Sequence, residues 1–228
     1  MMDEIYNCDC IEGMRGLPAD SVDLVLTDPP YGIDYQSGWR KEKYDPIEGD
    51  KNLNFLDDTF RELNRVMKQD TAIYMFCSWH NVDVFKQEFE RYFKLKNILV
   101  WVKNAHGSGD LKGSYAPKYE LILFGHKGRS LLRGKRPEDV MLYDRVNGIE
   151  SVHPTQKPVK LLEDLIANSS DAGAVVLDPF LGSGSTAVAA KLLGRHYIGY
   201  ELSPEYFDIA QRRLDETIYE PQIAEVVE

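Results

Sequence analysis

The chain has 228 residues, with 37 acidic and 27 basic side chains and a formal net charge of −10. This length suits one domain, or one domain with an insertion. The hydrophobic content of 43% is enough for a packed core, which argues against a disordered chain. No apolar run approaches the roughly 18 residues of a membrane span, and residues 1–10 lack the apolar stretch of a signal peptide. We therefore expect a soluble, cytoplasmic protein.

The three cysteines, Cys8, Cys10 and Cys77, are few and odd in number. Cys8 and Cys10 lie two positions apart, which is not the spacing of a zinc or redox pair. We predict neither a disulfide nor a bound metal.

Apolar runs and amphipathic patterns alternate along the chain. In chain order they predict strand 4–8, strand 22–27, helix 55–67, strand 71–77, helix 83–93, strands 97–102 and 119–124, helix 159–166, strand 174–177, helix 186–193, strand 197–200 and helix 204–214. The second helix should bury Val84, Phe85, Phe89 and Phe93. This alternation predicts an α/β fold with a mostly parallel sheet between helices. Strands 97–102 and 119–124 have no helix between them and should pair antiparallel.

The acidic balance taken alone argues against a nucleic-acid partner, but the charge is uneven. Residues 94–145 hold eleven basic and five acidic side chains, a surplus of +6 against −16 for the rest. Such a basic face is compatible with a phosphate backbone; the alternative is a solvated loop region. Long stretches at 32–54, 104–118 and 128–152 interrupt the regular pattern, and loops of this length are usually functional.

The tetrapeptide Asp28-Pro29-Pro30-Tyr31 follows an apolar strand, where α/β sheets bind ligands. The amine of adenine or cytosine is a poor nucleophile because its lone pair is conjugated into the ring. The Asp28 carboxylate and the Pro29 carbonyl could accept its two N–H groups and localise that pair. Two prolines would stiffen the turn, and Tyr31 offers a flat face for an extruded base. The alternative is a rigid turn with a solvated aspartate.

A second turn, residues 178–186, leads from an apolar strand through Gly182 and Gly184 into a predicted helix. Glycines allow a ligand to approach the backbone, and a helix start presents amides to it. Read alone, the pattern also fits a dinucleotide fingerprint, with Glu201 placed to hold ribose hydroxyls. No Gly-Lys-Ser/Thr sequence follows, so the turn is not a P-loop.

Together these motifs resemble the amino-methylating DNA methyltransferases that use S-adenosylmethionine. The tetrapeptide at Asp28 precedes the basic insertion, the His153-Pro-Thr-Gln-Lys-Pro158 segment and the turn at Asp178, an order similar to the permuted β class. The resemblance covers residues 5–214. It implies a Rossmann-like, doubly wound class I methyltransferase fold with one antiparallel strand, formed by a single domain over residues 1–228.

The resemblance also implies site roles. The catalytic residues would be Asp28, Pro29, Pro30 and Tyr31, and the cofactor would be S-adenosyl-L-methionine. The cofactor-binding residues would be Asp9, Cys10, Lys157, Asp178, Phe180, Gly182, Ser183, Gly184, Ser185, Thr186 and Glu201. Of these, Glu201 would bind the ribose, Asp9 and Cys10 would flank the adenine, and Lys157 would reach the cofactor's carboxylate. For Lys157 a solvated lysine at a helix start is the alternative; His153 is interpreted as structural.

Asp at the first position of the tetrapeptide favours adenine N6 as the methylated atom, with cytosine N4 as the alternative. A cytosine C5 enzyme needs a cysteine nucleophile, and none of the three cysteines follows a proline. A nicotinamide-dependent oxidoreductase would give Asp28 no task. A non-catalytic DNA-binding module would not explain why both motifs are intact.

The partner implied by the resemblance is double-stranded DNA. The target-recognition segment, about residues 128–152, is short for this class, and loops 32–54 and 104–118 or a homodimer would compensate. We expect DNA contacts from Arg129, Arg133, Lys135 and Arg136. A separate restriction endonuclease is left open.

Overall fold

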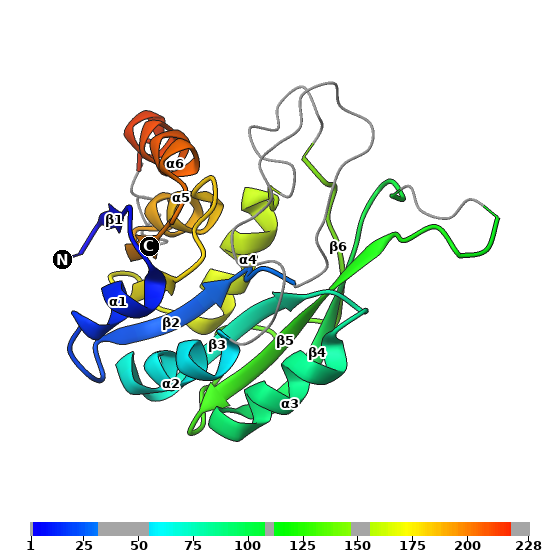
Figure 1. Ribbon diagram of the computed structural model, residues 1–228, viewed down its shortest axis with the longest axis horizontal. Helices are drawn as coiled ribbons and strands as arrows, with labels where there is room; N and C mark the ends of the chain where they lie inside the picture. The colour runs from blue at the N-terminus through cyan, green and yellow to red at the C-terminus, as the bar shows by residue number, and fades with distance from the viewer. Residues whose placement is uncertain (1, 32–54, 108–111, 147–155, 220–228) are drawn as a thin grey trace, which may run out of the picture.

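The computed structural model describes residues 2–31, 55–107, 112–146 and 156–219 (Figure 1). Its strands form one sheet in the order β1-β8-β7-β2-β3-β5-β4-β6. They are β1 (Glu4–Tyr6), β2 (Val22–Thr27), β3 (Met67–Cys77), β4 (Lys94–Val102), β5 (Tyr119–Lys127), β6 (Val140–Leu142), β7 (Val175–Asp178) and β8 (His196–Tyr200). All pairs are parallel except those of β5, which runs antiparallel to β3 and β4. The expected mostly parallel sheet with one antiparallel strand is confirmed.

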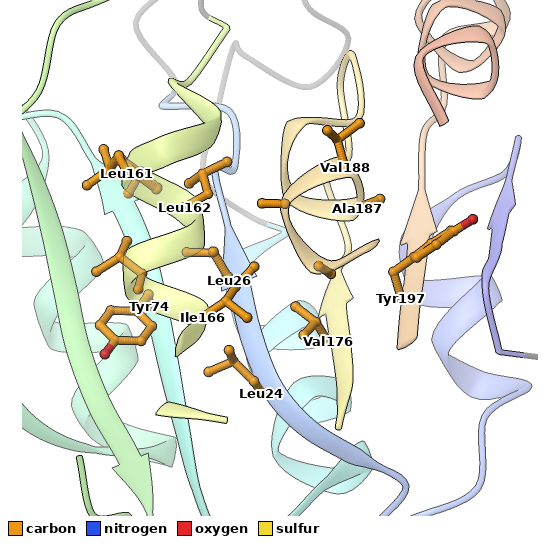
Figure 2. Close-up of a cluster of buried hydrophobic side chains, with 14 of the residues drawn as sticks. Leu24, Leu26, Tyr74, Leu161, Leu162, Ile166, Val176, Ala187, Val188 and Tyr197 are labelled. Carbon is orange, nitrogen blue, oxygen red and sulfur yellow. The ribbon is translucent and has the colours of Figure 1, made fainter. Parts of the chain in front are cut away.

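Helices cover both faces of the sheet. They are α1 (Cys10–Arg15), α2 (Leu56–Val66), α3 (Val82–Tyr92), α4 (Val159–Ser169), α5 (Ser185–Leu192) and α6 (Pro204–Glu216). Figure 2 shows Leu162 of α4 and Val188 of α5 among the buried side chains over β2 and β7. The opposite face is buried by α1, α2 and α3, which contribute Met14, Phe60 and Phe89. Two apolar cores therefore hold the sheet from either side.

Three local features differ from the sequence-based expectation. Val84 is 39% exposed, so the buried face of α3 is formed by Phe85 and Phe89 without it. Met67 begins β3 instead of ending α2. The short elements α1 and β6 were not predicted, because six and three residues are too few to show a periodic pattern.

The chain reverses its winding between β7 and β2. These strands are neighbours, with Leu24 opposite Val176 and Val25 opposite Leu177. After β7 the chain passes through α5 to β8 on one side, and after β2 it passes through α2 to β3 on the other. Such a switch point opens a crevice at the carboxyl ends of the strands, where ligands of α/β proteins bind. Both sequence motifs stand at this edge, which we term the carboxyl edge.

Within the described ranges, no helix is long and apolar enough to cross a membrane, and no group of side chains could hold a metal ion. The three cysteines are free thiols.

Candidate active site

The two motifs are joined through the side chain of Asp178, the last residue of β7. Its Oδ1 accepts a hydrogen bond from Thr27 Oγ1 at 2.8 Å and one from the Phe180 amide at 3.1 Å. Thr27 ends β2 and directly precedes Asp28. Burial raises the pKa of Asp178 to about 6, against the effect of these hydrogen bonds. The start of the glycine-rich turn is thus fixed beside the tetrapeptide.

The carboxylate of Asp28 is held at both oxygens. Tyr31 Oη donates to Oδ1 at 2.5 Å, and Lys157 Nζ contacts Oδ2. The Lys157 side chain is only 6% exposed, and its ammonium lies 4.9 Å from the centre of the Phe76 ring. The alternative of a solvated lysine is therefore wrong. Contact between Lys157 and the cofactor's carboxylate stays a prediction.

A second carboxylate, Glu120, lies in the same cluster and was missed by the sequence analysis. Its Oε2 is 3.2 Å from Lys157 Nζ, and its Oε1 is 2.6 Å from Lys103 Nζ. Because β5 is antiparallel, the start of this strand lies at the carboxyl edge with Asp28. A charged residue at the start of a strand is usually solvated, so its charge gave no sign of a place in the site. The predicted antiparallel pairing was the signal that could have placed Glu120 at the same edge as Asp28.

Tyr31 is held by more than its hydroxyl. Its ring packs edge-on against Phe85 at a centroid distance of 6.3 Å, and its carbonyl accepts a hydrogen bond from Asn81 Nδ2 at 2.5 Å. Pro29 before it is buried and Pro30 is half-buried. The sequence indicated a stacking surface, which stays a prediction, but gave no sign of the hydroxyl's bond to Asp28.

The two glycines of the second turn have different tasks. Both have positive φ, 55° at Gly182 and 85° at Gly184. A Cβ built on Gly184 would lie 2.9 Å from Ala210 Cβ, so this glycine lets α5 pack closely against α6. A Cβ on Gly182 would meet no atom of the described residues within 4 Å. Gly182 therefore borders open space, as a backbone that receives a ligand requires.

Two acidic side chains, Glu201 and Asp9, lie at the same edge of the sheet, and Glu201 contacts Gly182. Glu201, directly after β8, accepts hydrogen bonds from the amides of Gly182 at 2.7 Å and Ser203 at 2.8 Å, and burial raises its pKa. Asp9 caps α1 by accepting the Ile11 amide at 2.9 Å, with Cys10 buried behind it. Carboxylates at this edge beside an open glycine fit a nucleoside with free hydroxyls.

The remaining residues of the turn are held from inside the protein. Arg213 Nη1 of α6 lies 3.1 Å from Ser183 Oγ and 3.2 Å from Ser185 Oγ. The Thr186 hydroxyl helps to lower the pKa of Asp178 against the larger effect of burial. The ring of Phe180 packs against Phe55 at 5.6 Å. These contacts explain how the turn is fixed, and contact of these residues with the cofactor stays a prediction.

Two of the expected DNA contacts lie at the wrong edge of the sheet. The Arg129 amide donates to Asp70 Oδ1 at 2.8 Å, near the start of β3, and the Arg133 guanidinium pairs with Asp171 at 2.8 Å. Because β5 runs antiparallel, its end delivers the chain to the edge opposite Asp28. Contact of Arg129 and Arg133 with DNA stays a prediction, which their position opposite Asp28 does not favour.

The other two expected DNA contacts, Lys135 and Arg136, stay predictions. Lys135 is exposed, and Arg136 borders a cavity of about 430 Å³ on the α4 face. Loop 32–54, His153 and residues 147–152 of the target-recognition segment lie outside the described residues.

The model of the DNA methylase family matches residues 22–212. The chain belongs to the DNA methylases. Among relatives, the methylase is 36% identical over 214 residues to YubD of Escherichia coli (strain K12), whose methylase name is itself provisional. The match covers 93% of this chain and 90% of YubD. It is 31% identical over 242 residues to the type II methyltransferase M.HpaI of Haemophilus parainfluenzae, covering 94% and 75%. With the E. coli DNA adenine methyltransferase YhdJ it shares 29% over 250 residues, covering 92% and 82%.

Solved structures agree with this assignment. The complex of M1.HpyAVI with S-adenosylmethionine matches at a TM-score of 0.73 and 27% identity, over 93% of this chain and 98% of that one. The cytosine-N4-specific PvuII methyltransferase matches at 0.77 and 19%, over 98% and 89%, which shows the fold alone. The methylase is an S-adenosylmethionine-dependent DNA methyltransferase with the class I fold, as expected. The nicotinamide-dependent alternative is not supported.

Proposed function

We propose that this methylase transfers a methyl group to the N6 amine of adenine in double-stranded DNA, with the target base flipped out of the duplex. The observation that carries the proposal is the Asp28 carboxylate, fixed one strand away from the glycine-rich turn at the switch point of the sheet. The relative YhdJ, named a DNA adenine methyltransferase, supports adenine. Cytosine N4 remains the second candidate, supported only by the fold shared with the PvuII enzyme.

The proposed chemistry needs two hydrogen-bond acceptors at the target amine. S-adenosylmethionine supplies an electrophilic methyl group when bound. The Asp28 carboxylate and the Pro29 carbonyl accept the two N–H groups and localise the nitrogen lone pair. As the sulfur–methyl bond breaks, the nitrogen would gain the methyl group, S-adenosylhomocysteine would be left, and one N–H proton would leave to solvent by way of the Asp28 carboxylate. Because Tyr31 and Lys157 already hold the Asp28 carboxylate, little reorganisation of this group is needed during the reaction.

The cofactor would lie along the open side of Gly182. There the amide groups at the start of α5 would face the cofactor. The Glu201 carboxylate would give up its hydrogen bond from the Gly182 amide and accept hydrogen bonds from the ribose hydroxyls instead. Asp9 and Cys10 stand at the end of β1, which pairs with β8, and would border the adenine ring.

The DNA would lie across the carboxyl edge. The turn after β3 exposes 53% of Trp79, and its Asn81 binds the carbonyl of Tyr31. The connection from β4 to β5 exposes Lys118, and the segment after β6 exposes Arg145. We propose that this edge, with loops 32–54 and 104–118 and the part of segment 128–152 that follows β6, forms the DNA-binding part of a single domain spanning residues 1–228.

Three further proposals follow from the class. A homodimer would compensate for the short target-recognition segment, and analytical ultracentrifugation tests it. A separate restriction endonuclease would accompany the enzyme, as in type II systems. The enzyme would act in the cytoplasm, where DNA and cofactor meet.

The methylated base tests the function directly. Purified enzyme, cofactor and unmethylated DNA are incubated, and the DNA is digested to nucleosides for mass spectrometry. We expect N6-methyl-2′-deoxyadenosine; N4-methyl-2′-deoxycytidine alone would replace the adenine assignment with its alternative. Single-molecule sequencing of DNA from an expressing host would then give the target site.

A further inference from the structure

A chain of alternating charges runs from Asp28 along the carboxyl edge of the sheet. Asp28 pairs with Lys157, which also pairs with Glu120 at 3.2 Å, and Glu120 pairs with Lys103 at 2.6 Å. The four residues come from the end of β2, the start of α4, the start of β5 and the end of β4. A surface ion pair would contribute little to stability, and a buried one is costly to desolvate. A cluster of this kind beside a reacting group favours a functional role.

Resting on the function proposed above, we propose that Lys157 and Glu120 are positioning residues that tune Asp28 in opposite directions. Lys157 keeps the half-buried Asp28 carboxylate ionised, and Glu120 holds the ammonium of Lys157 while making Asp28 a stronger hydrogen-bond acceptor. Neither residue needs to touch the target base.

The role of Lys157 follows from burial. Desolvation raises the pKa of Asp28, and Lys157 opposes this rise. A protonated Asp28 would lose the negative charge that draws the hydrogens of the amine. Without Lys157, Glu120 would still pair with Lys103, but Asp28 would lose its ion-pair partner beside a second carboxylate, which raises the affinity of Asp28 for a proton.

The role of Glu120 has the opposite sign. Burial acts to raise its own pKa, but Lys157 and Lys103 lower it overall, so Glu120 stays ionised. Its negative charge adds to the rise in the pKa of Asp28. A more basic carboxylate accepts a stronger hydrogen bond from the amine, provided that Lys157 keeps it charged.

Other groups face Asp28 from neighbouring elements. Tyr31 donates a hydrogen bond to it, Asp178 on β7 repels it, and the Cys77 thiol at the end of β3 has a pKa raised by burial and then by Asp28. These groups remain unchanged in the variants below, so differences between the variants report on Lys157 and Glu120.

The test is the pH profile of kcat/KM for DNA methylation in Lys157→Met and Glu120→Gln. The acid limb reports the ionisation of Asp28 in the free enzyme. Loss of Lys157 should move this limb to higher pH by about one unit, which lowers kcat/KM by up to about tenfold at pH values below the limb. Loss of Glu120 should move the limb to lower pH and reduce the plateau severalfold. Affinity for S-adenosylhomocysteine, measured by calorimetry, should stay unchanged in Glu120→Gln; in Lys157→Met it tests the separate prediction that Lys157 reaches the cofactor's carboxylate.

Controls separate a positioning role from a structural one. Glu88→Gln removes a carboxylate paired with Arg91 on the surface of α3 and should leave the pH profile unchanged. Lys157→Arg keeps the positive charge, so its acid limb should stay close to the wild-type position. If Lys157→Met fails to fold, the double variant with Glu120→Gln avoids the unpaired second carboxylate and should again shift the limb upward relative to Glu120→Gln.

Two results would overturn the inference. One is an acid limb that moves the same way, or not at all, in both variants. The other is a Lys157→Met enzyme that loses cofactor affinity with an unmoved limb, which would assign Lys157 to the cofactor's carboxylate. Asp28→Ala is measured alongside. Full activity of that variant would reject the proposed function itself, a result distinct from either of these.

Discussion

The hydroxyl of Tyr31 gives the tetrapeptide a contact that its residue types alone do not reveal. A tyrosine at this position suggests a stacking surface, and the ring does stand beside Asp28. In the structure the Tyr31 hydroxyl also donates a hydrogen bond to Oδ1 of Asp28, and the target amine must reach this same carboxylate. The tyrosine can therefore fix the carboxylate's rotation before the base arrives.

Replacing Tyr31 separates these two roles. Tyr31→Phe should reduce the single-turnover methylation rate severalfold, because one hydrogen bond to a charged group is lost. Tyr31→Ala should cost more, because it also removes the ring and its contact with Phe85. Rapid-quench assays on both variants measure the difference. A Phe variant as active as wild type would leave the ring as the only functional part.

Gly182 and Gly184 provide a second contrast at the residue scale. Gly182→Val should weaken S-adenosylhomocysteine binding in calorimetry, because a branched side chain would fill the open space along the turn. Gly184→Ala should mainly lower the melting temperature, because its Cβ meets Ala210 at 2.9 Å. Unchanged cofactor affinity in a folded Gly182→Val protein would mean that the cofactor lies elsewhere.

Asp178 predicts a pH dependence of stability. Its pKa is raised from 3.8 to about 6 by burial, so its contribution to stability is fully present below pH 3.8 and is lost as the pH rises through about 6. Asp178→Asn keeps an oxygen for Thr27 and removes this loss. Relative to wild type, the variant should gain up to about 3 kcal/mol in free energy of unfolding between pH 4 and pH 7. Urea unfolding at both pH values checks this, and a constant difference would contradict the assigned pKa.

At the scale of elements, the sequence was most informative where strands are buried on both faces. Strand β2 was predicted with its observed bounds, and β7 within one residue at each end, because continuous apolar runs between turn signals are distinctive. The motifs stand directly after these strands, so their proximity could be expected from the order of a doubly wound sheet.

Other features depend on contacts between distant segments. Glu120 belongs to the site only because β5 runs against its neighbours, and its charge gave no signal of burial. The same reversal moves Arg129 and Arg133 to the far edge. Val84 lies within an apolar pattern, yet the packing of α3 leaves it exposed. Local periodicity does not contain this information.

For the whole molecule, the structure changes how the basic surplus of residues 94–145 is interpreted. Part of it is used internally, since Lys103, Lys127 and Arg133 pair with acids. The basic residues that remain for DNA should be those at the carboxyl edge, including Lys118 and Arg145, because methyl transfer at Asp28 requires the duplex to lie there. An acidic protein can thus hold DNA through a small, well-placed group of cations.

Charge reversals of equal size test this placement. Lys118→Glu and Arg145→Glu should each weaken DNA binding and reduce the slope of log affinity against log salt by about 0.9 for a lost phosphate contact. Arg133→Glu changes the net charge equally but lies at the opposite edge, so its slope should match wild type. Fluorescence anisotropy over a salt series gives all three slopes. A reduced slope in Arg133→Glu alone would return the DNA face to the originally expected residues.

The most direct test of the account is methyl transfer by Asp28→Ala, measured together with its cofactor binding. We expect the variant to fold and to bind S-adenosylhomocysteine with nearly wild-type affinity, because Asp28 acts on the target amine and the cofactor turn begins at Asp178. We also expect N6-methyladenine to be absent from the product DNA. Substantial methylation by the folded, cofactor-binding variant would contradict the central claim that Asp28 activates the target base.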